Sequence, residues 1–178
     1  MPCPVAHWNG EQTRQVNLDL VGESPLTIYL QDRIFRVEMR TPGDEIAHAA
    51  GFCLAQGVVS RSDDFADICF KSEEPNVVRL TLSGSRLKAS VADSTGSEFK
   101  KHGVCRFNDD LQLNLRAAFQ RLIRLGDVQR LREKTRASHA AAIFDDQLEL
   151  MAFAEDVGRH NALDKAIGKL FLENKLDR

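Results

Sequence analysis

Cys105, the last residue of the sequence HGVC, is the best candidate for a nucleophile in this chain. Lys101 and Arg106 lie close by in the sequence, and His102 is three residues away. Positive neighbours favour the thiolate, which is the reactive form of cysteine. We therefore predict that Cys105 is a reactive thiol, with an ordinary surface cysteine as the alternative.

A second group of polar residues lies in the sequence EDVGRHN at 155–161. Gly158 leads into a predicted helix, and the free N–H groups of a helix start favour an anion. Arg159 adds a planar donor suited to phosphate or carboxylate, and His160 and Asn161 can orient a polar ligand. The alternative is a capped helix with ordinary surface charges.

His139 is the third candidate, because the three alanines that follow it leave room for a closely packed group. A lone histidine can equally be a structural residue. Zinc deaminases place a glutamate two residues after such a histidine and paired cysteines further on. Here Ala141 occupies the glutamate position and no cysteine follows Cys105, so deaminase chemistry is excluded.

The remaining cysteines, Cys3, Cys53 and Cys69, form no CxxC pair and have no regular spacing. A structural zinc site normally needs four ligands in close pairs, so we predict no metal site. Cys53 lies on the apolar stripe of a predicted helix and is expected to be a small core residue. Cys3 is expected to lie in a disordered tail.

The net charge of −2 is unevenly distributed, because residues 100–136 contain ten lysines and arginines but four acids. This stretch is either a solvated helix face or a surface for a phosphate-bearing ligand or acidic partner. It lacks the interleaved aromatic residues of a nucleic-acid platform. Apolar runs are too short to cross a membrane, and the N-terminus does not resemble a secretion signal. We therefore expect a cytoplasmic protein.

The first ninety residues predict mainly strands. Alternating apolar residues at 16–20, 26–30 and 35–39 indicate strands, the last two forming a hairpin. A helix is predicted from Thr41 as N-cap, through an apolar stripe that includes Ile46 and Cys53, to a stop at Gly57. Further strands are expected at 78–82 and 87–91.

The second part of the sequence begins with a loop over 93–107 that contains Cys105. A helix capped by Asn108 and ending near Gly126 is predicted next, followed by two strands at 138–144 and 148–153. A helix with an apolar stripe from Ala162 to Phe171 completes the chain. The sequence therefore predicts a mixed α/β (α+β) protein, with a mainly β part at 1–95 and a second part at 96–178.

Two long stretches of the sequence are distinctive: SHAAAIFDDQLELMAFAEDVGRHNALDKAIG and RTPGDEIAHAAGFCLAQGVV. Both strings resemble the FdhD family of formate dehydrogenase accessory proteins. The resemblance implies a sulfur carrier that takes persulfide sulfur from a cysteine desulfurase. Its expected substrate is the molybdenum bis(molybdopterin guanine dinucleotide) cofactor, which it supplies to formate dehydrogenase. No permanently bound cofactor is expected.

The resemblance also implies a cytidine-deaminase-like α/β/α arrangement for the second part, incomplete at the C-terminus. Such an open sheet can pair with a second copy, which makes a homodimer an expectation. The family usually has CGVC where this chain has HGVC, so Cys105 alone would carry the persulfide. Cys105 is the expected transfer residue, and His139, Gly158, Arg159, His160 and Asn161 are the expected cofactor-binding residues.

Two alternative functions follow from the altered loop sequence and the incomplete second part. A non-catalytic chaperone could hold the cofactor or the dehydrogenase without moving sulfur, and the loss of the first loop cysteine favours it. An α/β domain with a purely structural role is the other.

Overall fold

The computed structural model describes residues 2–84 and 112–176. Their strands are β1 (Pro2–Trp8), β2 (Thr13–Asp19), β3 (Ser24–Leu30), β4 (Arg33–Arg40), β5 (Phe65–Phe70), β6 (Val77–Leu82), β7 (His139–Phe144) and β8 (Leu150–Asp156). Their α-helices are α1 (Glu45–Ala55), α3 (Leu115–Leu125), α4 (Arg130–Thr135) and α5 (Arg159–Leu172). Short 3₁₀ turns occur at Ser62–Asp64 and Gly126–Val128. The mixed α/β class predicted from the sequence is confirmed.

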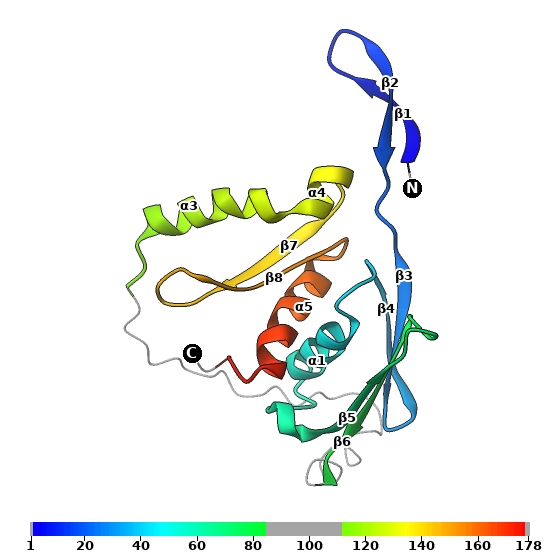
Figure 1. Ribbon diagram of the computed structural model, residues 1–178, viewed down its shortest axis with the longest axis vertical. Helices are drawn as coiled ribbons and strands as arrows, with labels where there is room; N and C mark the ends of the chain where they lie inside the picture. The colour runs from blue at the N-terminus through cyan, green and yellow to red at the C-terminus, as the bar shows by residue number, and fades with distance from the viewer. Residues whose placement is uncertain (1, 85–111, 177–178) are drawn as a thin grey trace.

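A four-stranded sheet with the order β4-β3-β6-β5 forms most of the first half (Figure 1). β3 and β4 form the predicted antiparallel hairpin, and β3 pairs in parallel with β6. One face of this sheet packs against α1. The buried residues of this core are Leu26, Ile28, Ala49, Ala50, Cys53, Val59, Val78, Leu80, Leu82 and Phe171.

The second half is built on the antiparallel β7–β8 hairpin. In Figure 1 this hairpin lies between α3 and α4 on one side and α5 on the other. Ala152 and Ala154 of β8 pack against Ala166 and Leu170 of α5 in a small second core. The likeness of this half to cytidine deaminases stays a prediction.

Helices α1 and α5 pack closely against each other and join the two halves. A Cβ atom on Gly168 would lie 1.8 Å from the carbonyl oxygen of Ala47, and one on Gly51 would lie 2.0 Å from that of Asp164. Only glycine permits this approach of the two backbones. The division into 1–95 and 96–178 stays a prediction, because its boundary lies outside the described residues.

The N-terminal β1–β2 hairpin projects from the rest of the molecule in Figure 1. Cys3 lies in β1 and is partly buried. The expectation of a disordered tail at Cys3 was therefore wrong, because pairing with β2 orders this segment. None of the helices in the described ranges has the length and hydrophobicity to span a membrane.

The starts of α1 and α3 were both predicted from cap residues. Helix α1 begins at Glu45 after Asp44, so the prediction of Thr41 as N-cap was wrong. Helix α3 begins after Asn114, whose side chain accepts a hydrogen bond from the backbone N–H of Ala117. The predicted cap Asn108 and the predicted strand at 87–91 lie outside the described residues.

Candidate functional site

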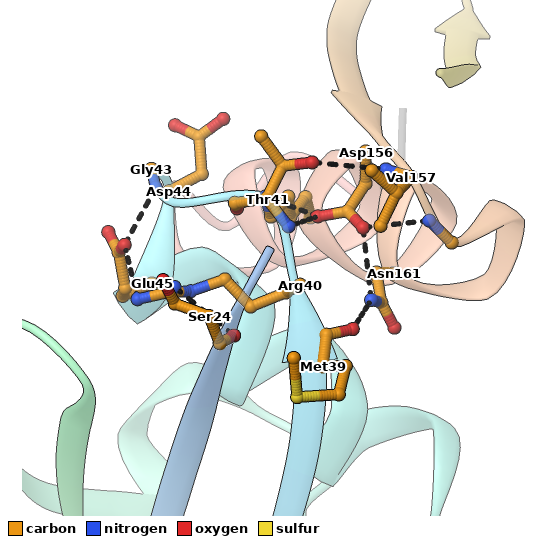
Figure 2. A network of polar contacts seen from close by, with 12 residues as sticks. Ser24, Met39, Arg40, Thr41, Gly43, Asp44, Glu45, Asp156, Val157 and Asn161 are labelled. Carbon is orange, nitrogen blue, oxygen red and sulfur yellow. Dashed lines mark hydrogen bonds and ion pairs between the residues drawn. The ribbon is translucent and has the colours of Figure 1, made fainter. Parts of the chain in front are cut away.

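The carboxylate of Asp156, at the end of β8, is completely buried and surrounded by donors (Figure 2). Its Oδ1 accepts from the backbone N–H of Gly158 at 2.9 Å and from Nδ2 of Asn161 at 3.0 Å. Its Oδ2 accepts from the backbone N–H of Thr41 at 3.0 Å and faces Nζ of Lys165 at 2.7 Å. A buried charge needs such partners to be tolerated. Asp156 therefore fixes the start of α5.

Thr41 connects this carboxylate to the segment that precedes α1. Its backbone N–H donates to Asp156, and its carbonyl oxygen accepts from Nζ of Lys165 at 2.7 Å. Its hydroxyl oxygen accepts from the backbone N–H of Val157 at 3.1 Å. The hydroxyl that the sequence predicted as a helix cap therefore binds the connection between β8 and α5 instead.

Arg40 is the second buried charge at this junction. Its Nη2 lies 3.0 Å from Oε1 of Glu45, at the start of α1. It also donates to the carbonyl oxygen of Pro75 at 2.8 Å and to Oδ1 of Asn76 at 3.1 Å. These contacts hold the end of β4 against both α1 and the segment that leads into β6. The site is thus supported from the side of the four-stranded sheet.

Glu155 anchors the opposite face of β8. Its Oε2 accepts from the backbone N–H of Leu131 at 2.8 Å, and its Oε1 accepts from that of Arg132 at 2.9 Å. The hydroxyl of Ser138 also donates to Oε1, at 3.0 Å. The carboxylate therefore caps the first turn of α4 and holds that helix on the β7–β8 hairpin.

Three of the predicted cofactor-binding residues lie near the start of α5 with their side chains exposed or partly exposed. His139 is exposed and lies opposite Asp156 in the β7–β8 register. Arg159 and His160 are exposed in the first turn of α5, after Gly158 at the N-cap. The backbone N–H groups of both make no hydrogen bond within the described residues. This corner of the molecule can therefore receive an anion.

Asn161 differs from the other predicted binding residues because it is buried. Its Nδ2 donates to the carbonyl oxygen of Met39 at 2.8 Å and to Asp156. Its Nδ2 group is therefore engaged inside the protein and not available to a ligand. Gly158 is restricted by the same side chain, because a Cβ atom there would lie 2.9 Å from Nδ2 of Asn161.

Three groups near α1 and α5 have shifted pKa values. Burial, aided by the positive charge of Lys165, lowers the pKa of His48 to about 4. Burial, with repulsion from Glu38, raises the pKa of Asp164 to about 6. Burial likewise raises the pKa of the Cys53 thiol to about 12. Cys53 is therefore a core thiol, as predicted, and is unsuited to nucleophilic chemistry.

The predicted transfer residue Cys105 and its neighbour His102 lie outside the described residues. Cys69 lies in β5 and is partly buried. Within residues 2–84 and 112–176, no three His, Cys, Asp or Glu side chains are grouped so that they could hold a metal ion. Sequence reasoning missed the roles of Thr41, Lys165 and Glu155, whose partners are distant in the chain.

Comparisons with known proteins identify relatives of this chain. A protein from Saccharolobus solfataricus named "Sulfur carrier protein FdhD" is 33% identical over 86% of this chain and 63% of its own length. Its namesake from Streptomyces avermitilis is also 33% identical, over 88% of this chain and 64% of its own. The chain therefore spans a little under two thirds of the length of these relatives.

A crystal structure from Desulfotalea psychrophila, of a protein assigned as a formate dehydrogenase accessory protein, has the same fold. It superposes with a TM-score of 0.73 at 19% identity and covers 97% of this chain and 68% of its own. The sequence model of the FdhD/NarQ family matches residues 21–177. This match contains both strings on which the resemblance was based, and the chain therefore belongs to the FdhD/NarQ family.

Proposed function

We propose that this protein is a sulfur carrier that supports formate dehydrogenase. In this function it takes persulfide sulfur from a cysteine desulfurase and passes it to the molybdenum cofactor, its substrate. The observation that carries the proposal is the family match over residues 21–177, together with relatives named sulfur carrier protein FdhD. The exposed polar corner at the start of α5 supports it.

Cys105 is the proposed carrier residue. Its thiolate attacks the terminal sulfur of the desulfurase persulfide, the S–S bond of the donor breaks, and the donor cysteine leaves as a thiolate. This exchange needs no oxidant, and it leaves the transferred sulfur as a persulfide on Cys105. Release of that sulfur as sulfide requires two electrons, which we assign to a low-molecular-weight thiol that becomes a disulfide.

The start of α5 is the proposed contact for the anionic cofactor. Arg159 supplies a planar guanidinium group, and the free N–H groups of the first turn supply donors. His139 and His160 add imidazole groups from β7 and α5, and Gly158 keeps the helix start uncovered. Asp156 and Asn161 hold this backbone in place from inside the protein.

The test is to incubate the protein with a cysteine desulfurase and free cysteine and to measure the intact mass. We expect one additional sulfur atom per chain, removed by a thiol reductant and absent in Cys105→Ala. Cys69→Ala is the matched control and should still accept sulfur. If wild type and Cys105→Ala take up the same amount, Cys105 is not the carrier.

A non-catalytic chaperone is the second candidate, and the observation that favours it is His102 in place of the first loop cysteine. Such a protein would hold the cofactor or the dehydrogenase without transferring sulfur. Complementation of a strain that lacks its own accessory protein separates the two functions. Restored formate dehydrogenase activity with the Cys105→Ala variant would support the chaperone and exclude sulfur transfer.

A further inference from the structure

Helices α3 and α4 border a cleft of about 330 Å³. This volume lies within the range of small-ligand sites, which is roughly 300–1,000 Å³. Two guanidinium groups, one amide and one carboxylate contribute the polar side chains of its lining. The lining residues are Leu122, Gly126, Gln129, Arg132, Glu133 and Arg136.

The segment that carries this cleft has an excess of positive charge. Within the described residues, six of the seven cationic side chains of the 112–136 segment form no ion pair: Arg116, Arg124, Arg130, Arg132, Lys134 and Arg136. The seventh, Arg121, pairs with Glu149 at 2.6 Å. The segment contains two acids, Asp127 and Glu133. Because the remaining cations are not neutralised locally, this segment attracts anions, and Arg132 and Arg136 bring two of its positive charges into the lining of the cleft.

The cleft is held in a fixed position relative to the start of α5. The carboxylate of Glu155 binds the first turn of α4, and Nη1 of Arg132 donates to the carbonyl oxygen of Ser138 at 2.9 Å. Ser138 directly precedes His139, which lies opposite Asp156. The guanidinium of Arg132 is therefore anchored at the end of the hairpin from which α5 starts.

We propose that the cleft between α3 and α4 binds a phosphate-bearing ligand, with the guanidinium groups of Arg132 and Arg136 contacting its phosphate oxygens. The planar donor fork of arginine suits the oxygens of a phosphate group. Leu122 provides an apolar wall for a less polar part of the ligand. The inference rests on the proposed function and deepens it, because it gives the phosphates of the anionic cofactor a second contact besides the start of α5.

Titration calorimetry with inorganic pyrophosphate tests the proposal on the whole chain. We expect wild type to bind pyrophosphate more tightly than orthophosphate, with an affinity that falls as salt is added. Arg136→Gln should weaken binding about tenfold, as expected for one charge-assisted hydrogen bond. Glu133→Gln should strengthen binding, because it removes the carboxylate that lines the cleft. Arg132→Lys, which keeps the charge but loses the fork, should weaken it.

The matched control is Arg33→Gln, which removes one exposed positive charge at the β3–β4 turn. It should leave pyrophosphate binding unchanged. The proposal is overturned if wild type does not bind pyrophosphate, or if Arg33→Gln weakens binding as much as Arg136→Gln. Sulfur loading of Cys105 is measured separately and should persist in Arg136→Gln. A failure of the cleft to bind phosphate is therefore distinguishable from a failure of the proposed sulfur transfer.

Discussion

Two neighbouring acids at the end of β8 hold different parts of the molecule. Side chains of successive strand residues point to opposite faces. Glu155 therefore reaches α4, whereas Asp156 reaches Thr41 and Lys165 on the other side. The ED pair of the EDVGRH sequence thus explains why the start of α5 has a defined position relative to both halves.

Lys165 should be essential for stability, because its ammonium group neutralises the buried carboxylate of Asp156. Lys165→Met leaves that carboxylate without its counter-ion, which is expected to lower the free energy of unfolding by about 3–5 kcal/mol. Urea denaturation followed by circular dichroism measures the change.

Lys175→Met is the matched control, because Lys175 is partly exposed and pairs with Glu173 near the surface. Its effect should stay within about 0.5 kcal/mol. The double variant Asp156→Asn/Lys165→Met should recover part of the lost stability. A single Lys165→Met variant as stable as wild type would show that the ion pair does not hold this junction.

His48 should make the protein sensitive to acid. The pKa of its imidazole is about 4 in the folded protein, whereas the ordinary pKa of histidine is 6.5. The unfolded chain therefore binds more protons between these pH values. The contribution of His48 to stability is complete above pH 6.5 and falls by roughly 3 kcal/mol as the pH is lowered to 4. Denaturation curves across this range, for wild type and His48→Leu, measure it.

Neither ring nitrogen of His48 has a hydrogen-bond partner within the described residues. His48→Leu should therefore remove the acid sensitivity without a large loss of stability at neutral pH. Retention of the full pH dependence in this variant would assign it to other groups.

Asp164 should have the opposite pH dependence, because its pKa is raised from 3.8 to about 6 in the folded protein. Here the folded state binds more protons between these values, so stability decreases as the pH rises through this window. Asp164→Asn should remove this decrease and make the effect of His48 easier to measure. An Asp164→Asn variant that is still less stable at pH 7 than at pH 5 would contradict the assignment of this pH dependence to Asp164.

At the scale of elements, the sequence predicted which helices and strands occur, and in which order, better than it predicted which side of each element is buried. The β3–β4 hairpin, β6, the β7–β8 hairpin, α1 and α5 were all predicted, because periodicity and turn residues are local signals. The predicted start of α1 was wrong because Thr41 binds residues more than a hundred positions away. Ile46 was assigned to the apolar stripe but is 37% exposed.

Gly168 should tolerate no side chain, because its Cβ position falls on the carbonyl oxygen of Ala47. Alanine normally stabilises a helix by about 1 kcal/mol relative to glycine. Gly168→Ala should nevertheless lower the free energy of unfolding by several kcal/mol, because α1 and α5 must separate. Thermal denaturation measures this.

Gly126→Ala is the matched control for that experiment. Gly126 has helical backbone angles at the end of α3, and nothing lies within 4 Å of its Cβ position. This substitution should leave the melting temperature unchanged or raise it. Equal melting temperatures for Gly168→Ala and wild type would show that the two helices are not in contact in solution.

At the scale of the whole molecule, the candidate site depends on contacts between halves that are distant in sequence. Sequence reasoning proposed Gly158, Arg159, His160 and His139, because glycine, charge and spacing are visible in the sequence. It could not predict that Asn161 faces inward toward Met39, because this contact depends on how α5 packs against β4. Tertiary packing therefore decides which candidates are exposed to a ligand and shows that Asn161 instead supports the start of α5.

Helix α3 presents an apolar surface to solvent that suits self-association. Leu115, Phe119 and Ile123 are 68%, 63% and 76% exposed, and they lie on one side of the helix. Monomeric proteins rarely leave a large contiguous patch of this kind uncovered. The β7–β8 sheet has two strands within the described residues, so its outer edges are also available for pairing. The homodimer expected from the sequence stays a prediction, and α3 is the surface on which we test it.

We expect light scattering coupled to size-exclusion chromatography to give the mass of a dimer at micromolar concentration. Phe119→Ser/Ile123→Ser should shift the protein to the monomer, because it removes apolar area that the second copy would bury. Ile34→Ser/Val37→Ser is the matched control, since both residues are exposed on β4, at 62% and 52%. It should remain dimeric. If wild type is already a monomer, or if the β4 variant dissociates instead, α3 does not form the contact between the two copies.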